Sequence, residues 1–448
     1  MDTSKIVFPE DFIWGVAASS YQIEGAIDKD GKGKSVWDTF THTKGKIFND
    51  DNGDITIDHY NMYKEDIKLM KELNIKSYRF SIAWPRVLPD GFGEKNNKGI
   101  DFYKRLVGEL LNVGIKPMVT LNHWDLPQKI QDKGGWVNRE TIKYFEEYAN
   151  LIFNEFSELV SIWITHNEPW VEAFLGNLYG VHAPGNKDWN KSLRVAHNLL
   201  LSHGKVVRIH KELNQKSKIG ISVNLTPSYP YTDSKEDILA AQNYDGFINR
   251  WFLDPLFKGE YPEDILNQYS NSFDTSFILQ DDLKIISTPM DFLGINYYTR
   301  AVAKHSNENE LNFEIVDLKD AEKTEMNWEI YPEGLYDLML RIKKDYGDIN
   351  IYITENGIAV NDKMNKDGKI NDEKRIDYLK KHLESLHSCI KSGVKVKGYY
   401  LWSFCDNFEW AYGYSKRFGI VFVDYKNLKR IIKDSGYWYK NVISNNGY

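Results

Sequence analysis

Two glutamates stand where apolar runs of the chain end, far apart in the sequence. Glu168 closely follows the run at 160–166, and Glu355 ends the run at 349–355. An asparagine lies next to each of them. Desolvation and hydrogen bonds can divide such a carboxyl pair into a proton donor and an ionised base or nucleophile. The pattern therefore favours acid–base or nucleophilic chemistry, whereas either glutamate taken alone is typical of a surface loop.

Two carboxyls so distant in sequence can act together only if the elements that carry them meet in space. The chain contains short β-rich runs separated by stretches with helical periodicity. The runs lie at 12–18, 76–84, 116–123, 160–166, 218–225, 291–299, 349–355 and 396–404. Apolar strands that alternate with amphipathic helices predict parallel pairing, and eight such units close into a (β/α)₈ TIM barrel. A doubly wound open sheet is the alternative.

The stretches between the runs carry apolar residues at three- and four-residue spacing, which predicts amphipathic helices. Three of these stretches are preceded by an expected N-cap residue: Asp58, Asn138 and Asn371. The irregular segments 30–57, 168–190 and 300–330 are predicted as long βα loops, where a barrel keeps its active site. No linker and no internal repeat divides the chain, so residues 1–448 are predicted to form one α/β domain.

The composition is that of a folded globular protein, with 42% hydrophobic and 27% charged residues among 448. The formal net charge is −7, and no cluster of five or more Lys or Arg occurs. A nucleic-acid partner or an anionic membrane surface is therefore not indicated, and a neutral small molecule is the expected partner.

The same sequence contains no apolar stretch of the ~18 residues that a membrane span requires. Residues 1–15 lack the apolar core of a secretion signal. Two cysteines, Cys389 and Cys405, predict no disulfide framework and fit a reducing compartment. We therefore expect a cytoplasmic protein, and both a monomer and a homo-oligomer are compatible with this sequence.

Aromatic residues are numerous, with 13 Trp, 28 Tyr and 22 Phe. Most such residues form core, but flat rings with a polar tip also suit the faces of sugars. Composition alone does not decide between these two uses.

Two motif-like segments predict no ligand site. The run G-K-G-K-S at 31–35 ends like a phosphate-binding loop, but Asp28 stands where the first glycine of that loop would be. The acidic segment at 50–54 resembles a calcium loop but lacks its glycine and its closing glutamate. No H-E-x-x-H motif occurs, so no zinc site is predicted.

Seven short motifs, spread over the whole chain, resemble those of family 1 glycoside hydrolases, the β-glucosidase family. They are Q-I-E-G-A at 22–26, R-F-S-I-A-W-P-R at 79–86, N-H-W-D-L-P at 122–127, T-H-N-E-P at 165–169, G-I-N-Y-Y-T at 294–299, I-T-E-N-G at 353–357 and D-N-F-E-W at 406–410. They occur in the family's order, and each falls at the end of a predicted strand.

The resemblance implies a retaining mechanism. Glu168 would be the general acid/base, and Glu355 the nucleophile that forms a covalent glycosyl-enzyme; retention places two such carboxyls ~5–5.5 Å apart. By the same resemblance, Arg79 and Tyr298 sit beside Glu355 and hold it ionised, whereas a structural ion pair is the alternative for the arginine. Asn167 is expected to hydrogen-bond the sugar 2-hydroxyl.

The resemblance also implies a set of substrate-binding residues, some of which would otherwise be interpreted as core. The set comprises Gln22, His123, Trp124, Asn296, Trp328, Trp402, Glu409, Trp410 and Phe418. Within it, Trp402 would offer a ring face to the terminal sugar, and Trp328 would form a platform for the leaving group.

Specificity is argued from three positions. Glu409 suits hydroxyls but would repel a 6-phosphate, and phosphoglycosidase relatives carry a small residue there with a Lys and a Tyr on the phosphate. Lys416 matches that cation, but Phe418 stands where the tyrosine is expected. An unphosphorylated sugar is therefore favoured. A 6-phospho-β-glucosidase and a non-catalytic sugar-binding barrel are the alternatives.

The predicted activity is hydrolysis of terminal non-reducing β-D-glucosyl residues by double displacement, with β-galactosides and β-fucosides as further substrates. The expected substrate is a small β-glucoside or a cello-oligosaccharide, and the resemblance implies no cofactor and no metal. Asn122, Asn177 and Cys405 depart from the family pattern. They leave the chain-length preference open.

Overall fold

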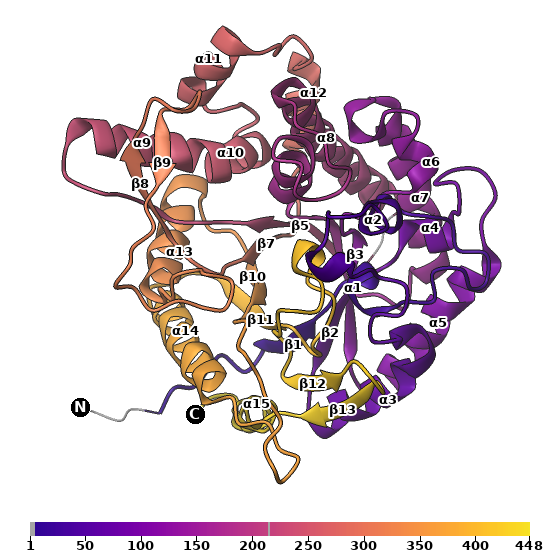
Figure 1. The fold of residues 1–448 in the computed structure, drawn as a ribbon. Helices are drawn as coiled ribbons and strands as arrows, with labels where there is room; N and C mark the ends of the chain where they lie inside the picture. The colour runs from indigo at the N-terminus through magenta and orange to yellow at the C-terminus, as the bar shows by residue number, and fades with distance from the viewer. Residues whose placement is uncertain (1–4, 214–215) are drawn as a thin grey trace.

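A closed barrel of eight parallel strands forms the centre of the molecule (Figure 1). The structure is a computed structural model that describes residues 5–213 and 216–448. Around the barrel the strands follow the order β1-β11-β10-β7-β5-β4-β3-β2. Their bounds are β1 (Ile13–Ala17), β2 (Ser77–Ser81), β3 (Lys116–Asn122), β4 (Ile162–Asn167), β5 (Lys218–Asn224), β7 (Phe292–Asn296), β10 (Ile351–Asn356) and β11 (Val396–Trp402). Each predicted run overlaps one of these strands, so the barrel prediction is confirmed.

Helices surround the barrel and cover the outer faces of its strands (Figure 1). The longer ones are α3 (His59–Glu72), α5 (Asn97–Asn112), α7 (Glu140–Phe156), α8 (Trp189–Glu212), α9 (Lys235–Asp245), α11 (Glu263–Ser272), α13 (Glu333–Tyr346), α14 (Glu373–Lys391) and α15 (Asp434–Asn445). The shorter ones are α1 (Ser20–Ile23), α2 (Val36–Thr41), α4 (Trp84–Val87), α6 (Gln128–Gln131), α10 (Trp251–Phe257) and α12 (Gln280–Ile286). Helices such as α5 and α7 bury their apolar stripe, whereas α9 leaves Ile238 and Leu239 exposed.

The expected N-cap position is confirmed at Asp58, whereas the other two expected residues lie one position too early. Asp58 occupies the N-cap position of α3 but has a left-handed backbone, and its carboxylate accepts from the Asn61 side chain instead of a helix amide. Asn138 lies one residue too early, although its Oδ1 accepts from the Glu140 amide at 3.0 Å. Asn371 is likewise one residue early, because α14 is preceded by Asp372.

The three segments predicted as long loops follow the carboxyl ends of β1, β4 and β7. They contain short regular elements that the sequence did not indicate. The first contains α2, the second a π-helical turn at Val171–Leu175, and the third β8 (Ala301–His305) and β9 (Phe313–Ile315). Both of these strands join β6 (Ser228–Pro230) in a small sheet, and β12 (Val421–Asp424) pairs with β13 (Lys429–Ile432).

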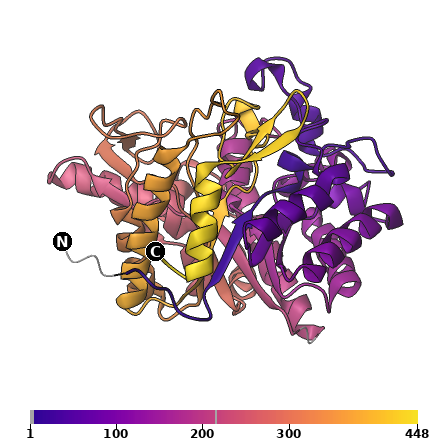
Figure 2. The same ribbon diagram turned by 90° about the horizontal axis from the view of Figure 1, so that it is seen from below.

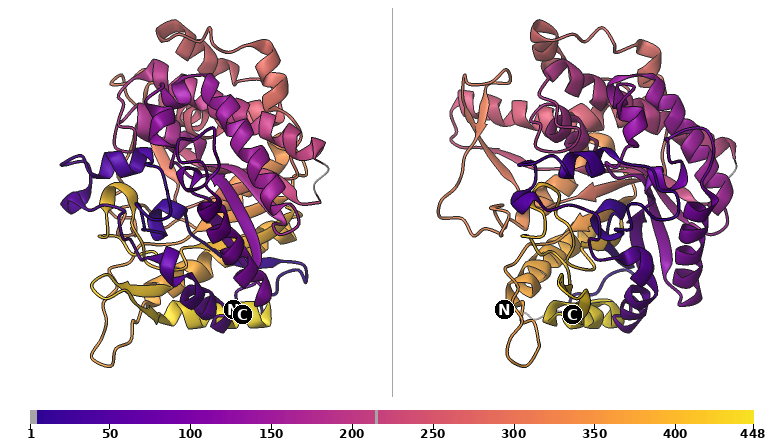
Figure 3. Two further views of the ribbon diagram at one scale, coloured as in Figure 1. Left: turned by 90° about the vertical axis from the view of Figure 1, so that its right-hand side faces the viewer. Right: turned by 45° about the vertical axis from the view of Figure 1, so that its right-hand side comes forward.

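The two ends of the described chain lie side by side, close to α15 (Figures 2 and 3). The backbones of Ile6 and Tyr448 exchange hydrogen bonds of 2.9 and 3.0 Å. Asn446 strengthens this closure, because its side-chain amide donates to the Phe8 carbonyl at 2.7 Å. The first and last parts of the barrel are thereby joined to each other.

The packing between β10 and β11 provides a test of the fold. A Cβ added at Gly357, just after β10, would lie 1.8 Å from the Trp402 carbonyl oxygen. Because backbone cannot yield like a flexible side chain, Gly357→Ala is expected to lower the free energy of unfolding by about 1–3 kcal/mol. Urea denaturation measures this loss.

Gly108 within α5 is the matched control, since a Cβ there has no heavy atom within 4 Å. Gly108→Ala is expected to raise the free energy of unfolding by about 0.5–1 kcal/mol, because alanine favours helix. Equal effects of the two substitutions would contradict the packing argument.

Candidate active site

Glu168 and Glu355 lie at the carboxyl end of the barrel, where β4 and β10 deliver them. Both are buried, with 7% and 4% of their surface exposed. A chain of hydrogen bonds joins the two carboxyls: Asn296 Nδ2 donates to Glu168 Oε1 (2.6 Å) and to Asn167 Oδ1 (3.0 Å). Arg79 then donates from Nη2 to the same Asn167 oxygen (2.6 Å) and from Nη1 to Glu355 Oε1 (2.7 Å). Four barrel strands therefore supply one connected polar site.

Glu355 has partners that Glu168 lacks. Arg79 forms an ion pair with it, and Tyr298 Oη donates to its second carboxylate oxygen at 2.6 Å. The guanidinium is fixed by a further bond from Nη1 to the Thr354 carbonyl, at 2.9 Å. Cation and phenol both bond directly to this carboxyl and stabilise its ionised form.

These contacts place one proton on a particular carboxyl. Burial and the nearby charge of Glu355 raise the pKa of Glu168 to about 8. Burial raises the pKa of Glu355 as well, but Arg79 and Tyr298 act in the opposite direction. The pair near neutral pH therefore consists of a protonated Glu168 and an ionised Glu355.

A third carboxyl shares the pocket. Burial and the charge of Glu355 raise the pKa of Glu409 to about 8. Its Oε2 lies 3.4 Å from Gln22 Nε2, which also donates to the Phe408 carbonyl at 2.8 Å. Among the described residues, Arg79 is the cation that bonds to one of these three carboxyls, Glu355. Its single positive charge can balance one carboxylate.

His123 presents a free donor. The Asn167 oxygen accepts from Arg79 and Asn296, so the amide nitrogen of Asn167 is the donor toward His123 Nε2, at 3.1 Å. Burial and the Arg79 charge hold the pKa of His123 well below its usual range, so the ring is neutral with its proton on Nδ1. That buried Nδ1 has no partner among residues 5–213 and 216–448. It suits a ligand hydroxyl.

Aromatic rings form two groups on either side of the carboxyls. In the first, the His123 ring is roughly parallel to Trp402 and Trp410, with centroids 6.1 and 6.0 Å away, and Trp124 packs 4.5 Å from Trp410. In the second, the members are Tyr298, Trp328 and Phe418, with centroids 5.2–6.3 Å apart. The structure thus brings together every site residue that the sequence predicted.

Three of these residues have left-handed backbones although they are not glycine. The φ angles are 74° at Trp124, 45° at Glu168 and 46° at Trp410. Such a conformation costs roughly 1–2 kcal/mol per residue and recurs where function requires a particular side-chain direction. All three follow the carboxyl end of a barrel strand.

A cleft of about 480 Å³ continues outward from Glu168 and includes residues that the sequence analysis missed. Asn296, Tyr298 and Trp328 line its inner end. Its outer walls are formed by Trp170, Asn224 and Tyr244, and by Arg300 and Glu329. Two signals could have revealed part of this set, because Trp170 directly follows T-H-N-E-P and Arg300 directly follows G-I-N-Y-Y-T.

Two of the departures from the family pattern contact one buried residue, Glu172. Asn122 Nδ2 donates to Glu172 Oε2 at 2.8 Å, and Asn177 Nδ2 donates to the Glu172 carbonyl at 2.9 Å. Neither asparagine lines the cleft. Cys405 is buried as well. These positions therefore act through packing behind the site, not through its outer walls.

The motif-like segments have structural uses. Ser35 is the N-cap of α2 and forms a reciprocal capping box with Asp38.

In the described part of the chain, no group of three His, Cys, Asp or Glu side chains could hold a metal ion. Likewise, no described helix is both long and apolar enough to cross a membrane.

A closed (β/α)₈ barrel with two connected carboxyls and aromatic walls at its carboxyl end is the arrangement of a glycoside hydrolase. The sequence model of glycosyl hydrolase family 1 matches residues 4–448. The chain therefore belongs to glycosyl hydrolase family 1.

Individual relatives match over nearly their full lengths. Beta-glucosidase A of Acetivibrio thermocellus is 55% identical over 99% of this chain and 100% of its own. A family 1 β-glucosidase of Thermotoga maritima, solved in complex with isofagomine lactam, is 48% identical with a TM-score of 0.96, covering 99% of this chain and 100% of its own. A 6-phospho-β-glucosidase of Bacillus subtilis is 40% identical over 100% of this chain and 99% of its own.

The buried Glu172 carboxyl gives a pH-dependent test. Burial raises its pKa to about 8 from the ordinary 4.5. Between these values the unfolded chain releases a proton that the folded protein keeps, so stability falls as the pH rises. Glu172→Gln keeps the acceptor for Asn122 and removes the titration. Its melting temperature relative to wild type is expected to be unchanged near pH 5 and roughly 2–4 °C higher near pH 8.

The exposed Glu147 on α7 is the control for this measurement. Glu147→Gln should shift the melting temperature equally at both pH values. The interpretation of Glu172 is wrong if its variant follows the same pH dependence as wild type in scanning calorimetry.

Proposed function

We propose that the protein is a retaining β-glucosidase that hydrolyses terminal non-reducing β-D-glucosyl residues by double displacement. The observation that carries this proposal is the unequal environment of two connected carboxyls. Glu355 has a cation and a phenol as donors, whereas Glu168 has an amide and a raised pKa. One carboxyl is thereby suited to attack and the other to donate a proton.

In the first step the ionised Glu355 attacks the anomeric carbon while Glu168 protonates the leaving oxygen. The bond between that carbon and the leaving group breaks, and an ester to Glu355 forms. Arg79 and Tyr298 orient the attacking oxygens because each holds one of them. We assign to Asn167 a hydrogen bond to the sugar 2-hydroxyl that strengthens in the transition state.

In the second step the roles reverse. Esterification removes the negative charge of Glu355, which, after burial, is the largest cause of the raised pKa of Glu168. Glu168 can then ionise and accept a proton from water as that water attacks the anomeric carbon. Hydrolysis of the ester restores both carboxyls, and the product keeps the β configuration.

We assign the terminal sugar to the pocket around Gln22, His123 and Glu409. The free Nδ1–H of His123 supplies a donor. Asn407 and Phe408 accept from the amide nitrogen of Gln22, so its Oε1 can accept, whereas the carboxyl of Glu409 can donate and accept. Trp402 would cover the apolar face of the ring, and Trp410 would donate from its indole nitrogen. Because these groups can serve either orientation of the 4-hydroxyl, we propose β-galactosides and β-fucosides as further substrates.

We assign the leaving group to the cleft that continues from Glu168. Trp328 at its inner end offers a ring face, and the remaining length extends to Arg300 and Glu329. A space of about 480 Å³ suits a second sugar or an aryl group, which supports cello-oligosaccharides and aryl β-glucosides as substrates. That a relative was solved with isofagomine lactam supports a small-molecule ligand.

The two alternatives receive less support. A 6-phosphate would need a cation beside the sugar, but the Lys416 amine donates to the Glu325 carbonyl, and Phe418 offers no hydroxyl. Glu409 would also have to remain beside the phosphate. A non-catalytic sugar-binding barrel would not require an Arg79 and a Tyr298 that both act on Glu355.

We further propose that residues 1–448 act as a single catalytic domain in the cytoplasm. Hydrogen bonds join the two ends of the described chain: Ile6 bonds to Tyr448, and Tyr439 on α15 donates to the Gly15 carbonyl on β1. These bonds support a single domain. Both cysteines of the chain are buried and unpaired, which suits a reducing compartment.

Removing the proposed nucleophile tests the mechanism. Glu355→Ala is expected to lower kcat by at least about 10⁴-fold, because no ester can form. Added azide should restore part of the turnover by attacking from the vacated side, and it should give the α-glycosyl azide. Proton NMR identifies the anomer, and substantial turnover without azide would disprove the assignment.

A panel of nitrophenyl glycosides tests the substrate class. We expect the highest kcat/KM with the β-glucoside, lower values with the β-galactoside and β-fucoside, and values at least about 100-fold lower with the β-mannoside and the 6-phospho-β-glucoside. A preference for the phosphorylated sugar would replace this proposal with the 6-phospho-β-glucosidase. No hydrolysis of any member would favour the non-catalytic barrel.

A further inference from the structure

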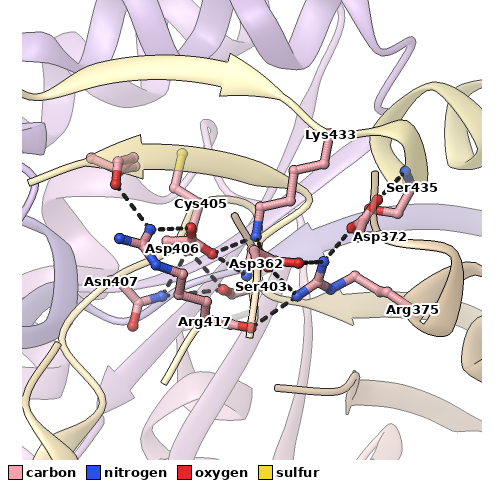
Figure 4. Close-up of polar contacts among 12 residues, drawn as sticks. Asp362, Asp372, Arg375, Ser403, Cys405, Asp406, Asn407, Arg417, Lys433 and Ser435 are labelled. Atoms are coloured by element: carbon pink, nitrogen blue, oxygen red, sulfur yellow. Dashed lines mark hydrogen bonds and ion pairs between the residues drawn. The ribbon is translucent and has the colours of Figure 1, made fainter. Parts of the chain in front are cut away.

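Six ionised side chains form a buried cluster beside the segment that carries Glu409 and Trp410 (Figure 4). We call it the ion cluster. It consists of three carboxylates and three cations: Asp362, Asp372, Asp406, Arg375, Arg417 and Lys433. Five of these side chains are at most 1% exposed, and Arg417 is 19% exposed. The charges balance, so every buried ion has a partner of opposite sign.

Lys433 lies at the centre of the ion cluster. Its Nζ donates to Asp362 Oδ2 at 2.5 Å and to Asp406 Oδ1 at 2.7 Å. Arg375 donates to the same Asp362 oxygen at 2.8 Å and to Asp362 Oδ1 at 3.3 Å, and it also pairs with Asp372. The start of α14, the start of α15, the loop after β10 and the segment after β11 are thereby fixed to one another (Figure 4).

Asp406 is the member of the ion cluster that lies closest in the sequence to Glu409 and Trp410. Its Oδ2 accepts from Arg417 Nη1 at 2.6 Å, and its Oδ1 accepts from the Gly419 amide at 3.0 Å as well as from Lys433. It therefore fastens both ends of segment 406–419, within which Glu409 lies. The ends are in close contact, since a Cβ at Gly419 would lie 2.1 Å from the Asp406 amide nitrogen.

The next residue continues this connection toward the pocket. Asn407 Nδ2 donates to Ser403 Oγ at 3.2 Å and to the Cys405 carbonyl at 3.0 Å, which fixes its Oδ1 as the acceptor. That oxygen accepts from Gln22 Nε2 at 3.1 Å. Gln22 also lies against Glu409. One peptide bond and one hydrogen bond thus separate Asp406 from Gln22, a group assigned to the sugar.

We propose that Asp406 is a positioning residue, which uses the ion cluster to fix Gln22, Glu409 and Trp410 for the terminal sugar. This inference rests on the proposed function of that pocket. Buried ion pairs contribute little net stability compared with apolar packing, but they require a definite geometry because an unpaired charge is costly. The catalytic carboxyls have other supports, Arg79, Asn296 and Tyr298, and these lie outside segment 406–419.

The test is Asp406→Asn, compared with Asp372→Asn. Both aspartates are fully buried members of the ion cluster. An asparagine at 406 must turn an amide donor toward either Arg417 or Lys433, which releases segment 406–419. An asparagine at 372 can still accept from Ser435 N, and Arg375 keeps Asp362 as its partner. The second variant therefore disturbs the ion cluster without releasing the segment.

KM for nitrophenyl β-glucoside and the Kd of isofagomine lactam by calorimetry are the readouts. For Asp406→Asn we expect both constants to rise about tenfold with kcat within about threefold of wild type, because uniform binding is lost. For Asp372→Asn we expect KM and Kd within about twofold of wild type. Circular dichroism verifies that each variant is folded at the assay temperature.

Arg417→Lys is the milder variant if Asp406→Asn does not fold. It keeps the charge, but the lysine amine ends one atom short of Nη1, which donates to both Asp406 Oδ2 and the Val423 carbonyl, so we expect KM and Kd to rise about threefold. Unchanged constants in a folded Asp406→Asn or in Arg417→Lys would overturn the inference. Equal losses in Asp406→Asn and Asp372→Asn would do the same. Failure of the wild type to hydrolyse any glycoside would instead refute the proposed function.

Discussion

One guanidinium organises the site. Arg79 is almost completely buried, and it donates to Glu355 and to Asn167 at once. The first contact makes one carboxyl an anion, and the second fixes the amide on which Asn296 and His123 depend. Because three carboxyls share the pocket with this one bonded cation, two of them hold their protons near neutral pH. Glu168 and Glu355 therefore take different roles because Arg79 bonds to Glu355 and supplies one positive charge.

The barrel brings these side chains together at one end of its strands. The strands are short, and four of them carry polar side chains of the site in their middle or at their carboxyl end. Residues from β2, β4, β7 and β10 thereby bond to one another directly, although they lie far apart in the sequence. The loops are then free to form the sugar pocket and the outer cleft.

Sequence reasoning succeeded where the signal was local. The eight apolar runs are buried on both faces, so the strands stood out, and the site residues lay in motifs at their ends. The predicted helix starts at Asn138 and Asn371 are one residue early, because Arg139 and Asp372 occupy the N-cap positions without a side-chain capping bond. The sequence does not predict the contacts of Glu172, Lys433 and Asp406. These contacts join segments that lie far apart in the chain, and no repeating pattern of residues connects them. The residues that line the outer cleft could not be predicted for the same reason, because they come from several separate loops.

The left-handed residues Trp124, Glu168 and Trp410 have a consequence for the evolution of heat tolerance. Glycine would relax the backbone at each of these positions, yet it would delete an indole or a carboxyl from the pocket. Selection for thermal resistance therefore has little room at the rim of the barrel. It must act instead on the outer helices and on the closure between Ile6 and Tyr448, where backbone and side chains can change without altering what the pocket holds.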